Sequence, residues 1–478
     1  MKNLSIIFNN QNSDIHTVSA ALRQLRHDSR AKPLSHEQRY SLLKRCIRLL
    51  QENKDKLCEA YSQDFGHRAH ANTLLSDILG SIEALKHSLG GLDKWSQDET
   101  RKSPFPDTCS YIQYKPLGVV GIMSPWNFPL VLTFGPLSGI LAAGNRAIIK
   151  PSEFTPSGSR LLCHLISEYF SPDEILTVQG DAGVSAFFAS LPLDHLVFTG
   201  SSATGRHVMR AAAENLTPVT LELGGKSPVI ISESANLEMA AERIMTAKVF
   251  NAGQICIAPD YVMVPARYAD VFISYAVAYL RKSYGSYLKN PDFSSIINVT
   301  HSRRLNELLD DATKKCERVI SASEELDLPS EGRIIPRLIL NPSDNSRIMQ
   351  EEIFGPLLPI ITYEKTDECI ERIRNGEKPL ALYYFGQNED EFRELQCSTD
   401  SGALVFNDVM SHVMVHDLPF GGVGYSGMGA YHGEDGFRRF SHARPIFIQS
   451  DTGLSNLLMR APFTAEKIKQ ITSLINQL

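Results

Sequence analysis

The spacing of hydrophobic positions changes about a hundred residues into the chain. Between residues 17 and 95, apolar residues such as Leu42, Cys46 and Leu49 recur at helical spacing, and charged residues fill many of the gaps. This period predicts amphipathic helices. Residues 109–116 instead alternate between apolar and polar side chains, which predicts a strand.

From residue 118 onward, short apolar runs alternate with helical stretches such as 161–170 and 205–215. The runs that predict strands are residues 119–123, 147–149, 174–178, 195–199 and 229–231. Strand and helix in alternation predict an α/β fold with a doubly wound parallel sheet, whose ligands bind at the carboxyl ends of the strands. A second α/β block is expected over about 224–403, and a last strand at 443–449.

The length of 478 residues exceeds what one hydrophobic core usually supports, so two or three lobes are expected. Hydrophobic residues make up 43% of the chain and charged residues 21%, a balance that excludes intrinsic disorder. Because the sequence contains no low-complexity linker, we expect these lobes to pack together rather than to be tethered.

Charge and cysteine usage exclude several classes of protein. The net charge is -6 and no basic stripe is present, so no nucleic-acid partner is expected. None of the eight cysteines forms a C-x-x-C pair or lies near a histidine at metal-ligand spacing, which argues against a zinc site and against a disulfide framework. With no signal-peptide core and no membrane-spanning run, the expected location is the cytoplasm.

The C-terminal residues 464–478 have apolar positions at the spacing of a short amphipathic helix. Such a helix could dock on the body of the protein or contact a membrane surface. The pattern favours docking on the body and leaves contact with a membrane open.

A glycine-rich turn follows one of the predicted strands. Residues 195–199 lead into Gly200-Ser-Ser-Ala-Thr-Gly205, ahead of a predicted helix. The turn is not the G-x-G-x-x-G fingerprint, because Ser202 stands at a glycine position, and it is not a P-loop. Its free backbone N–H groups could still face a phosphate, so a nucleotide site and an ordinary strand–turn–helix connection both remain open.

Lys150 and Glu153 lie just past the end of another predicted strand. A ribose would lie there in a doubly wound sheet, since a carboxylate accepts hydrogen bonds from ribose hydroxyls and an ammonium donates them. The alternative is a pair of solvated charges in a loop.

Three further residues are candidates for catalysis. Cys256 follows a stretch of small residues and could be a nucleophile, although a lone cysteine is more often structural. Glu222, flanked by leucines and followed by two glycines, could be a partly desolvated base or an exposed residue at a strand end. Asn127, between two prolines, could be a fixed oxyanion donor or a cap of a turn.

Taken together, these motifs resemble the aldehyde dehydrogenase superfamily, and the resemblance covers about residues 110–445. The motifs occur in the order of that superfamily, as Pro125-Trp-Asn-Phe-Pro129, Lys150-Pro-Ser-Glu153, Phe198-Thr-Gly-Ser201, Leu221-Glu-Leu-Gly-Gly-Lys226, Gly253-Gln-Ile-Cys256, Glu351-Glu-Ile-Phe-Gly-Pro356 and Pro419-Phe-Gly-Gly-Val-Gly424.

The resemblance implies a role for each matching residue. Cys256 would be the nucleophile, Glu222 the general base, and Asn127 with the backbone N–H of Cys256 the oxyanion hole. The implied ligands of NAD or NADP are Lys150 and Glu153 at the adenine ribose, Gly200 and Ser201 at the pyrophosphate, Glu352 at the nicotinamide ribose, and Trp126, Leu223 and Phe354 elsewhere along the cofactor. No metal is implied.

The resemblance also implies a three-part subunit. A Rossmann-type NAD(P)-binding domain would comprise residues 1–106 and 119–223, and an α/β catalytic domain residues 224–410. Residues 107–118 and 411–478 would form a small β oligomerisation segment and the C-terminal tail, and the expected assembly is a homodimer.

Within the superfamily, residues 209–226 resemble the class 3 branch, and bacterial coniferyl aldehyde dehydrogenases most closely. This implies an aromatic aldehyde as substrate, with medium-chain or fatty aldehydes as the leading alternatives. Glu153 favours NAD because its charge repels a 2′-phosphate, yet NADP stays possible. Three other interpretations compete with this one: a CoA-dependent acylating enzyme, a reductase of acyl phosphates or semialdehydes, and a binding or structural protein that has lost catalytic activity. The presence of both Cys256 and Glu222 counts against the last of these.

Overall fold

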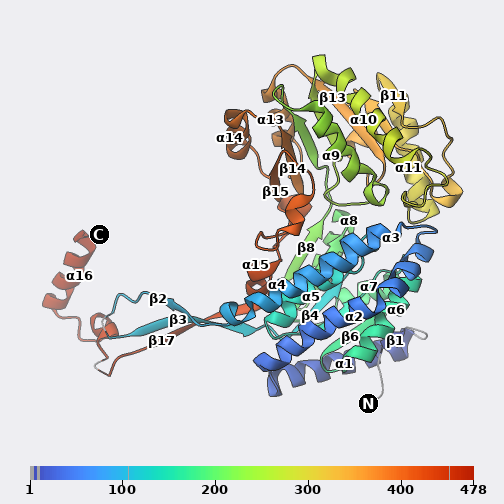
Figure 1. Ribbon diagram of the computed structural model, residues 1–478. Helices are drawn as coiled ribbons and strands as arrows, with labels where there is room; N and C mark the ends of the chain where they lie inside the picture. Colours follow the sequence, from blue (N-terminus) through green and yellow to red (C-terminus); the bar gives the residue numbers. More distant parts are fainter. Residues whose placement is uncertain (1–4, 8–10, 106, 452, 478) are drawn as a thin grey trace.

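The chain forms two lobes and a projecting arm (Figure 1). The computed structural model describes residues 5–7, 11–105, 107–451 and 453–477. Outside the described part lie residues 1–4, 8–10, 106, 452 and 478, which fall within the predicted segments 1–106 and 411–478. Each lobe is built on a seven-stranded, mainly parallel sheet, so the predicted α/β fold is confirmed.

The first sheet has the strand order β1-β6-β5-β4-β7-β8-β16. Its strands are β1 (Ser5–Ile7), β4 (Val119–Met123), β5 (Arg146–Lys150), β6 (Ile175–Gln179), β7 (His195–Gly200), β8 (Val219–Leu223) and β16 (Gly427–Met428). Only β16 runs antiparallel to its neighbour. The chain adds β5 and β6 on one side of β4, then β7 and β8 on the other, which places the topological switch point at the carboxyl ends of β4 and β7.

Helices cover both faces of the first sheet, which explains why its strands are apolar on both sides. Val119 and Ile148 pack with one hydrophobic cluster, and Val120 and Ile149 with another. The helices of this lobe are α1 (Gln11–Ala31), α2 (His36–Asp64), α3 (His70–Asn72), the π-helix η1 (Thr73–Leu79), α4 (Gly80–Trp95), α5 (Val131–Ala142), α6 (Pro156–Tyr169), α7 (Ala182–Ala189) and α8 (Ser202–Ala213). The helical pattern over residues 17–95 is thus several helices, interrupted at residues 32–35 and again at residues 65–69.

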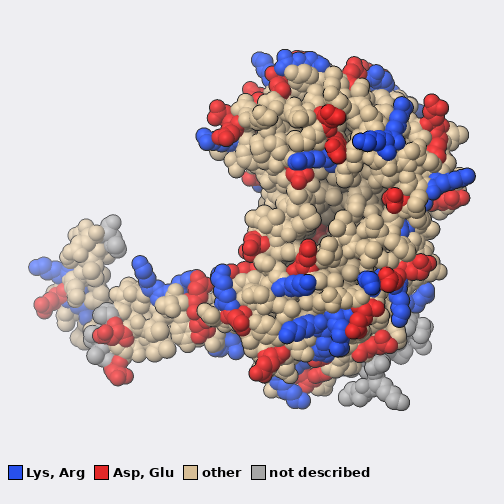
Figure 2. All heavy atoms as spheres, viewed as in Figure 1, with Lys and Arg blue, Asp and Glu red and all other residues tan. Residues whose placement is uncertain are grey.

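The second sheet has the order β11-β12-β13-β10-β9-β14-β15 and forms the other lobe. Its strands are β9 (Pro228–Ile231), β10 (Tyr261–Pro265), β11 (Arg318–Ser321), β12 (Arg337–Leu340), β13 (Leu357–Tyr363), β14 (Ala381–Phe385) and β15 (Ala403–Phe406). Its main helices are α9 (Leu237–Val249), α10 (Ala269–Tyr284), α11 (Val299–Thr313), α12 (Arg347–Gln350), α13 (Thr366–Asn375) and α14 (Glu389–Ser398). The surface is recessed where the lobes meet, and acidic and basic side chains are interspersed over the visible face (Figure 2).

The arm is a three-stranded antiparallel sheet of β2 (Glu99–Arg101), β3 (Cys109–Pro116) and β17 (Ser441–Ile448). The short helix α15 (Gly433–Arg439) leads from the body into β17. The predicted strands at 109–116 and 443–449 are therefore partners in one sheet.

The predicted C-terminal helix is present as α16 (Ala465–Gln477), but it lies at the end of the arm, away from the body of its own chain (Figure 1). No residue of α16 is buried. Docking on the body of the same subunit, the favoured expectation, is therefore wrong, and contact with a membrane surface stays a prediction. No helix in the described part of the chain is both long enough and apolar enough to cross a membrane.

Candidate active site

Cys256 follows a left-handed turn at the end of α9. Asn251, Ala252 and Gly253 have φ angles of 49°, 53° and 75° in succession. Such angles are costly for residues with a Cβ, and a Cβ at Gly253 would press on the carbonyl oxygen of Gly355. The surrounding structure must hold this turn in place, and the fully buried side chain of Asn251 is one of its anchors.

Glu222 brings its carboxylate directly to this cysteine. The side chain projects from β8 and is 1% exposed, and Cys256 Sγ donates a hydrogen bond to Glu222 Oε1 at 3.3 Å. The alternative of an exposed glutamate at a strand end is therefore wrong. Cys256 as a whole residue is partly exposed.

Burial shifts the protonation of both groups. It raises the pKa of Glu222 to about 7, against the opposing effect of hydrogen bonds from Cys256 and Tyr431. Burial, and next the charge of Glu222, raise the pKa of the Cys256 thiol well above its usual range. The proton therefore rests on sulfur, with a carboxylate of near-neutral pKa positioned to accept it.

Asn127 lies beside the same loop. Its side chain is 4% exposed, and its Nδ2 donates to the backbone oxygen of Gln254 at 3.1 Å. Since an amide nitrogen carries two N–H groups, one remains for a developing oxyanion. Gln254 is itself fixed, because its Nε2 donates to Asn251 O and its Oε1 accepts from Ile297 N. The structure thus brings together the three residues expected to carry catalysis.

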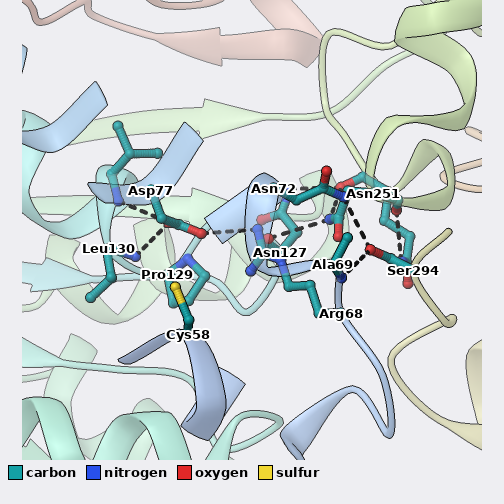
Figure 3. A network of polar contacts seen from close by, with 12 residues as sticks. Cys58, Arg68, Ala69, Asn72, Asp77, Asn127, Pro129, Leu130, Asn251 and Ser294 are labelled. Atoms are coloured by element: carbon teal, nitrogen blue, oxygen red, sulfur yellow. Dashed lines mark hydrogen bonds and ion pairs between the residues drawn. The ribbon is translucent and has the colours of Figure 1, made fainter. Parts of the chain in front are cut away.

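A buried ion pair anchors the turn that carries Asn127 (Figure 3). Arg68 and Asp77 are both fully buried, with Arg68 Nη2 2.9 Å from Asp77 Oδ2. The other carboxylate oxygen of Asp77 accepts from the backbone N–H groups of Leu130 and Val131, just after the asparagine. This ion pair has no sequence signal, because its two members become neighbours of residues 127–131 only in the fold.

We expect Asp77→Asn to destabilise the protein by about 3–5 kcal/mol, because it leaves the Arg68 charge buried without a counter-ion. The free energy of unfolding in urea measures this loss. Asp270→Asn is the matched control: its carboxylate pairs with Arg318 but is 81% exposed, so its loss should be within about 1 kcal/mol. A loss below about 1 kcal/mol in Asp77→Asn would contradict the anchoring role.

Tyr431 is a site residue that sequence reasoning missed. It is 2% exposed, and its hydroxyl donates to Glu222 Oε2 at 3.4 Å. It comes from the segment after β16, which pairs with β8 and so carries Tyr431 to the base. No spacing or composition signal marks this tyrosine, since a long-range strand pairing positions it.

Several expected cofactor residues lie at carboxyl ends of the first sheet. Lys150 ends β5 and is 2% exposed, and its Nζ lies 3.1 Å from Glu153 Oε2. Gly200 ends β7, Leu223 ends β8, and Ser201 caps α8 by accepting a hydrogen bond from the backbone N–H of residue 204. Lys150 and Glu153 are thus an ion pair with a buried ammonium, which contradicts the alternative of two solvated loop charges.

Glu352 packs against the glycines that follow β8. A Cβ at Gly224 would overlap its carboxylate, and the backbone N–H of Gly225 donates to it. Burial, and next the charge of Asp260, raise the pKa of Glu352 to about 8. Gly224, Gly225 and Glu352 line a cavity of about 750 Å³ between the two sheets, which Ser202 also lines.

Trp126 and Phe354 form an edge-to-face pair with ring centroids 5.4 Å apart. His301, which sequence reasoning missed, also packs here. Its ring centroid lies 5.2 Å from that of Trp126 and 6.2 Å from that of Phe154. Trp126 precedes Asn127 in the chain, and Phe128, which follows Asn127, stacks on Phe250. In the described ranges, no three His, Cys, Asp or Glu side chains are arranged to hold a metal ion.

The whole body of the chain is similar to known proteins. A model of the aldehyde dehydrogenase family matches residues 5–446. A coniferyl aldehyde dehydrogenase from a Pseudomonas species is 53% identical over 90% of this chain and 90% of its own. Aldehyde dehydrogenase family 3 member A2 from Mus musculus is 38% identical over 93% and 90%. The structure of Staphylococcus aureus AldH in its substrate-bound state superposes with a TM-score of 0.90, at 35% identity, over 96% of this chain and 99% of that one. The chain therefore belongs to the aldehyde dehydrogenase family.

Proposed function

We propose that this enzyme oxidises an aromatic aldehyde of the coniferyl type to its carboxylic acid, with water releasing the product. The observation that carries the reaction is the 3.3 Å hydrogen bond from Cys256 Sγ to the buried Glu222 carboxylate, beside the amide of Asn127. The aromatic substrate is supported by the 53% identity to a protein named coniferyl aldehyde dehydrogenase.

The residues of the site suit each step of this reaction. Glu222 takes the thiol proton, and Cys256 Sγ attacks the aldehyde carbon to give a thiohemiacetal. The free N–H of the Asn127 amide and the backbone N–H of Cys256 stabilise its oxyanion. Loss of hydride leaves a thioester on Cys256. Glu222 next gives up the thiol proton to solvent and is again a carboxylate. It then removes a proton from water as the water attacks the thioester, and it passes this proton to the departing sulfur, which releases the acid and the free thiol.

Enzymes of this family use NAD or NADP, which when bound accepts the hydride. The residues at the switch point fit a dinucleotide, because a buried ammonium–carboxylate pair follows β5 and the backbone at Gly224 is bare where a side chain would collide. We propose that Lys150 and Glu153 hold the adenine ribose, that Gly200, Ser201 and Leu223 lie along the phosphates and nicotinamide, and that Glu352, Phe354 and Trp126 position the nicotinamide riboside.

We propose NAD as the preferred cofactor. The variant Glu153→Gln tests whether the charge of Glu153 causes this preference. The Glu153 carboxylate would lie next to a 2′-phosphate, so its removal should raise the NADP to NAD ratio of kcat/KM by about tenfold or more. Glu168→Gln, at an exposed glutamate of α6, is the matched control and should leave that ratio unchanged. An unchanged ratio in Glu153→Gln would remove this residue from cofactor selection.

Steady-state kinetics with cinnamyl-type, benzyl and aliphatic aldehydes, each with NAD and with NADP, test the proposed substrate class. We expect the highest kcat/KM for coniferyl aldehyde. A higher kcat/KM for medium-chain or fatty aldehydes would favour that alternative instead. Product analysis with and without CoA tests the release step, and an acyl-CoA product would overturn hydrolysis by Glu222.

We further propose that residues 1–106 and 119–223 form the cofactor-binding domain and residues 224–410 the catalytic domain. Residues 107–118 and 411–478 would join two subunits into a homodimer. Exposed apolar side chains on the arm support this role, since Phe447 and Ile448 of β17 are each 51% exposed. Sedimentation of the purified protein tests the dimer.

A further inference from the structure

Four histidines form a series of ring contacts that begins at Phe420, close to the catalytic residues. His432 stacks on Phe420 with ring centroids 5.2 Å apart, and His412 lies 6.3 Å from the same ring. His416 lies 5.5 Å from His432, and His87 of α4 lies 5.8 Å from His416. We call His87, His412, His416 and His432 the histidine cluster.

A single aromatic side chain, Tyr431, separates the histidine cluster from Glu222. Tyr431, whose hydroxyl donates to Glu222, lies 6.0 Å from Phe420 between ring centroids and 5.3 Å from His432. Tyr383 links the nucleophile to the cluster by a second route. Its hydroxyl donates to the backbone oxygen of Ile257, next to Cys256, and its ring centroid lies 6.5 Å from that of His412. A continuous series of rings therefore leads from the thiol and its base to the histidine cluster.

Three imidazoles of the cluster, those of His412, His416 and His432, are neutral at physiological pH. Burial lowers the pKa of His412 to about 4 and that of His432 to about 3, and it lowers the pKa of His416 as well. Each neutral ring therefore offers one N–H donor and one nitrogen acceptor.

Most of this hydrogen-bonding capacity is unused. Both ring nitrogens of His412 and of His416, and Nδ1 of His432, are buried without a hydrogen-bond partner in the part of the chain that the structure describes. Buried polar groups without a partner are uncommon and costly, so these nitrogens require partners, from water or from a ligand, that the described part of the chain does not supply. His87 Nε2 lies 3.3 Å from Asp417 Oδ1, but it is likewise buried without a hydrogen bond among the described residues.

We propose that the histidine cluster binds the ring hydroxyl of a hydroxylated aromatic aldehyde, an inference that rests on the proposed function. With the aldehyde carbon at Cys256, the aromatic ring would lie along Tyr431 and Phe420, and its hydroxyl would reach His412 and His416. A phenol can donate to one imidazole nitrogen and accept from an imidazole N–H, so it matches neutral histidines. An aliphatic aldehyde would leave these nitrogens without partners, and a site built around a hydroxyl discriminates strongly against analogues that lack it.

The first test uses the unmodified enzyme with cinnamaldehyde, 4-methoxycinnamaldehyde and 4-hydroxycinnamaldehyde. We expect kcat/KM for the hydroxylated aldehyde to exceed the other two by about tenfold or more, the value of one well-placed hydrogen bond. If none of the three is oxidised while aliphatic aldehydes are, the proposed function fails. If all three are oxidised with similar kcat/KM, the aromatic function stands and the role of the histidine cluster is overturned.

The second test removes the imidazoles. In His412→Leu and His416→Leu, the ratio of kcat/KM for 4-hydroxycinnamaldehyde to that for cinnamaldehyde should fall about tenfold. His416→Gln, whose amide keeps a donor and an acceptor, should recover part of the ratio. His164→Leu, at an exposed histidine of α6, is the matched control and should keep the wild-type ratio. An unchanged ratio in both leucine variants, with melting temperatures near wild type, would overturn the proposal. If the leucine variants do not fold, the ratio in His416→Gln and the comparison of the three aldehydes test the proposal instead.

Discussion

Cys256→Ala should abolish aldehyde oxidation, with kcat reduced by about 10⁴-fold or more, because no other group can form the covalent intermediate. Absorbance of the reduced cofactor measures the loss. Cofactor affinity, measured by calorimetry, should persist, because Lys150, Glu153 and Glu352 lie on other elements and none is hydrogen-bonded to the thiol. Alanine is smaller than cysteine at a partly exposed position, so the fold should tolerate it.

The matched control is Cys397→Ala. Cys397 is also a free thiol, but it is exposed on α14, in the outer part of the second lobe, so its removal should leave kcat unchanged. Substantial turnover in Cys256→Ala would remove this residue from the reaction. Loss of cofactor binding together with turnover would instead indicate that the left-handed turn before Cys256 had collapsed.

The parts of the fold that the sequence predicts are those governed by local patterns. β4 has the predicted bounds of 119–123, and β5, β6 and β7 lie within one residue of their predicted bounds at each end, because buried parallel strands are short apolar runs between polar connections. The two-residue β16 was not predicted, since it exists only through its pairing with β8. Likewise, the apolar spacing of residues 464–478 predicts the helix α16 but contains no information about where that helix lies.

In the candidate site, too, the residues with local motifs could be predicted, whereas those positioned by long-range contacts could not. Cys256, Glu222 and Asn127 could be named from sequence motifs, and the structure brings them together. Their geometry could not be predicted, because it depends on contacts between distant segments. Tyr431 reaches Glu222 across 209 positions of the chain, and Asp77 holds the Asn127 turn from the N-terminal helices. The histidine cluster was missed for the same reason, since His87 meets the others only in the folded protein.

Glu222→Gln should slow hydrolysis of the thioester by about 10²–10⁴-fold, because the amide cannot accept a proton from water. Formation of the thioester should be slowed less. Loss of the Glu222 charge removes one of the effects that raise the pKa of the Cys256 thiol, so the thiol ionises more readily without help from the carboxylate. A thioester should therefore accumulate on Cys256, visible as an adduct by mass spectrometry and as a burst of reduced cofactor close to one equivalent per site.

The pH dependence of hydrolysis gives an independent measure of the same role. The base must be ionised to act, and burial raises the pKa of Glu222 from the ordinary 4.5 to about 7. In the unmodified enzyme, hydrolysis should therefore accelerate as pH rises through about 7 and level off above it, and Glu222→Gln should lose this rise. Glu214→Gln, at an exposed glutamate after α8, is the matched control and should keep both the rate and the profile. If the adduct in Glu222→Gln clears at the wild-type rate, another group activates water, and the short contact with Cys256 serves the thiol proton alone.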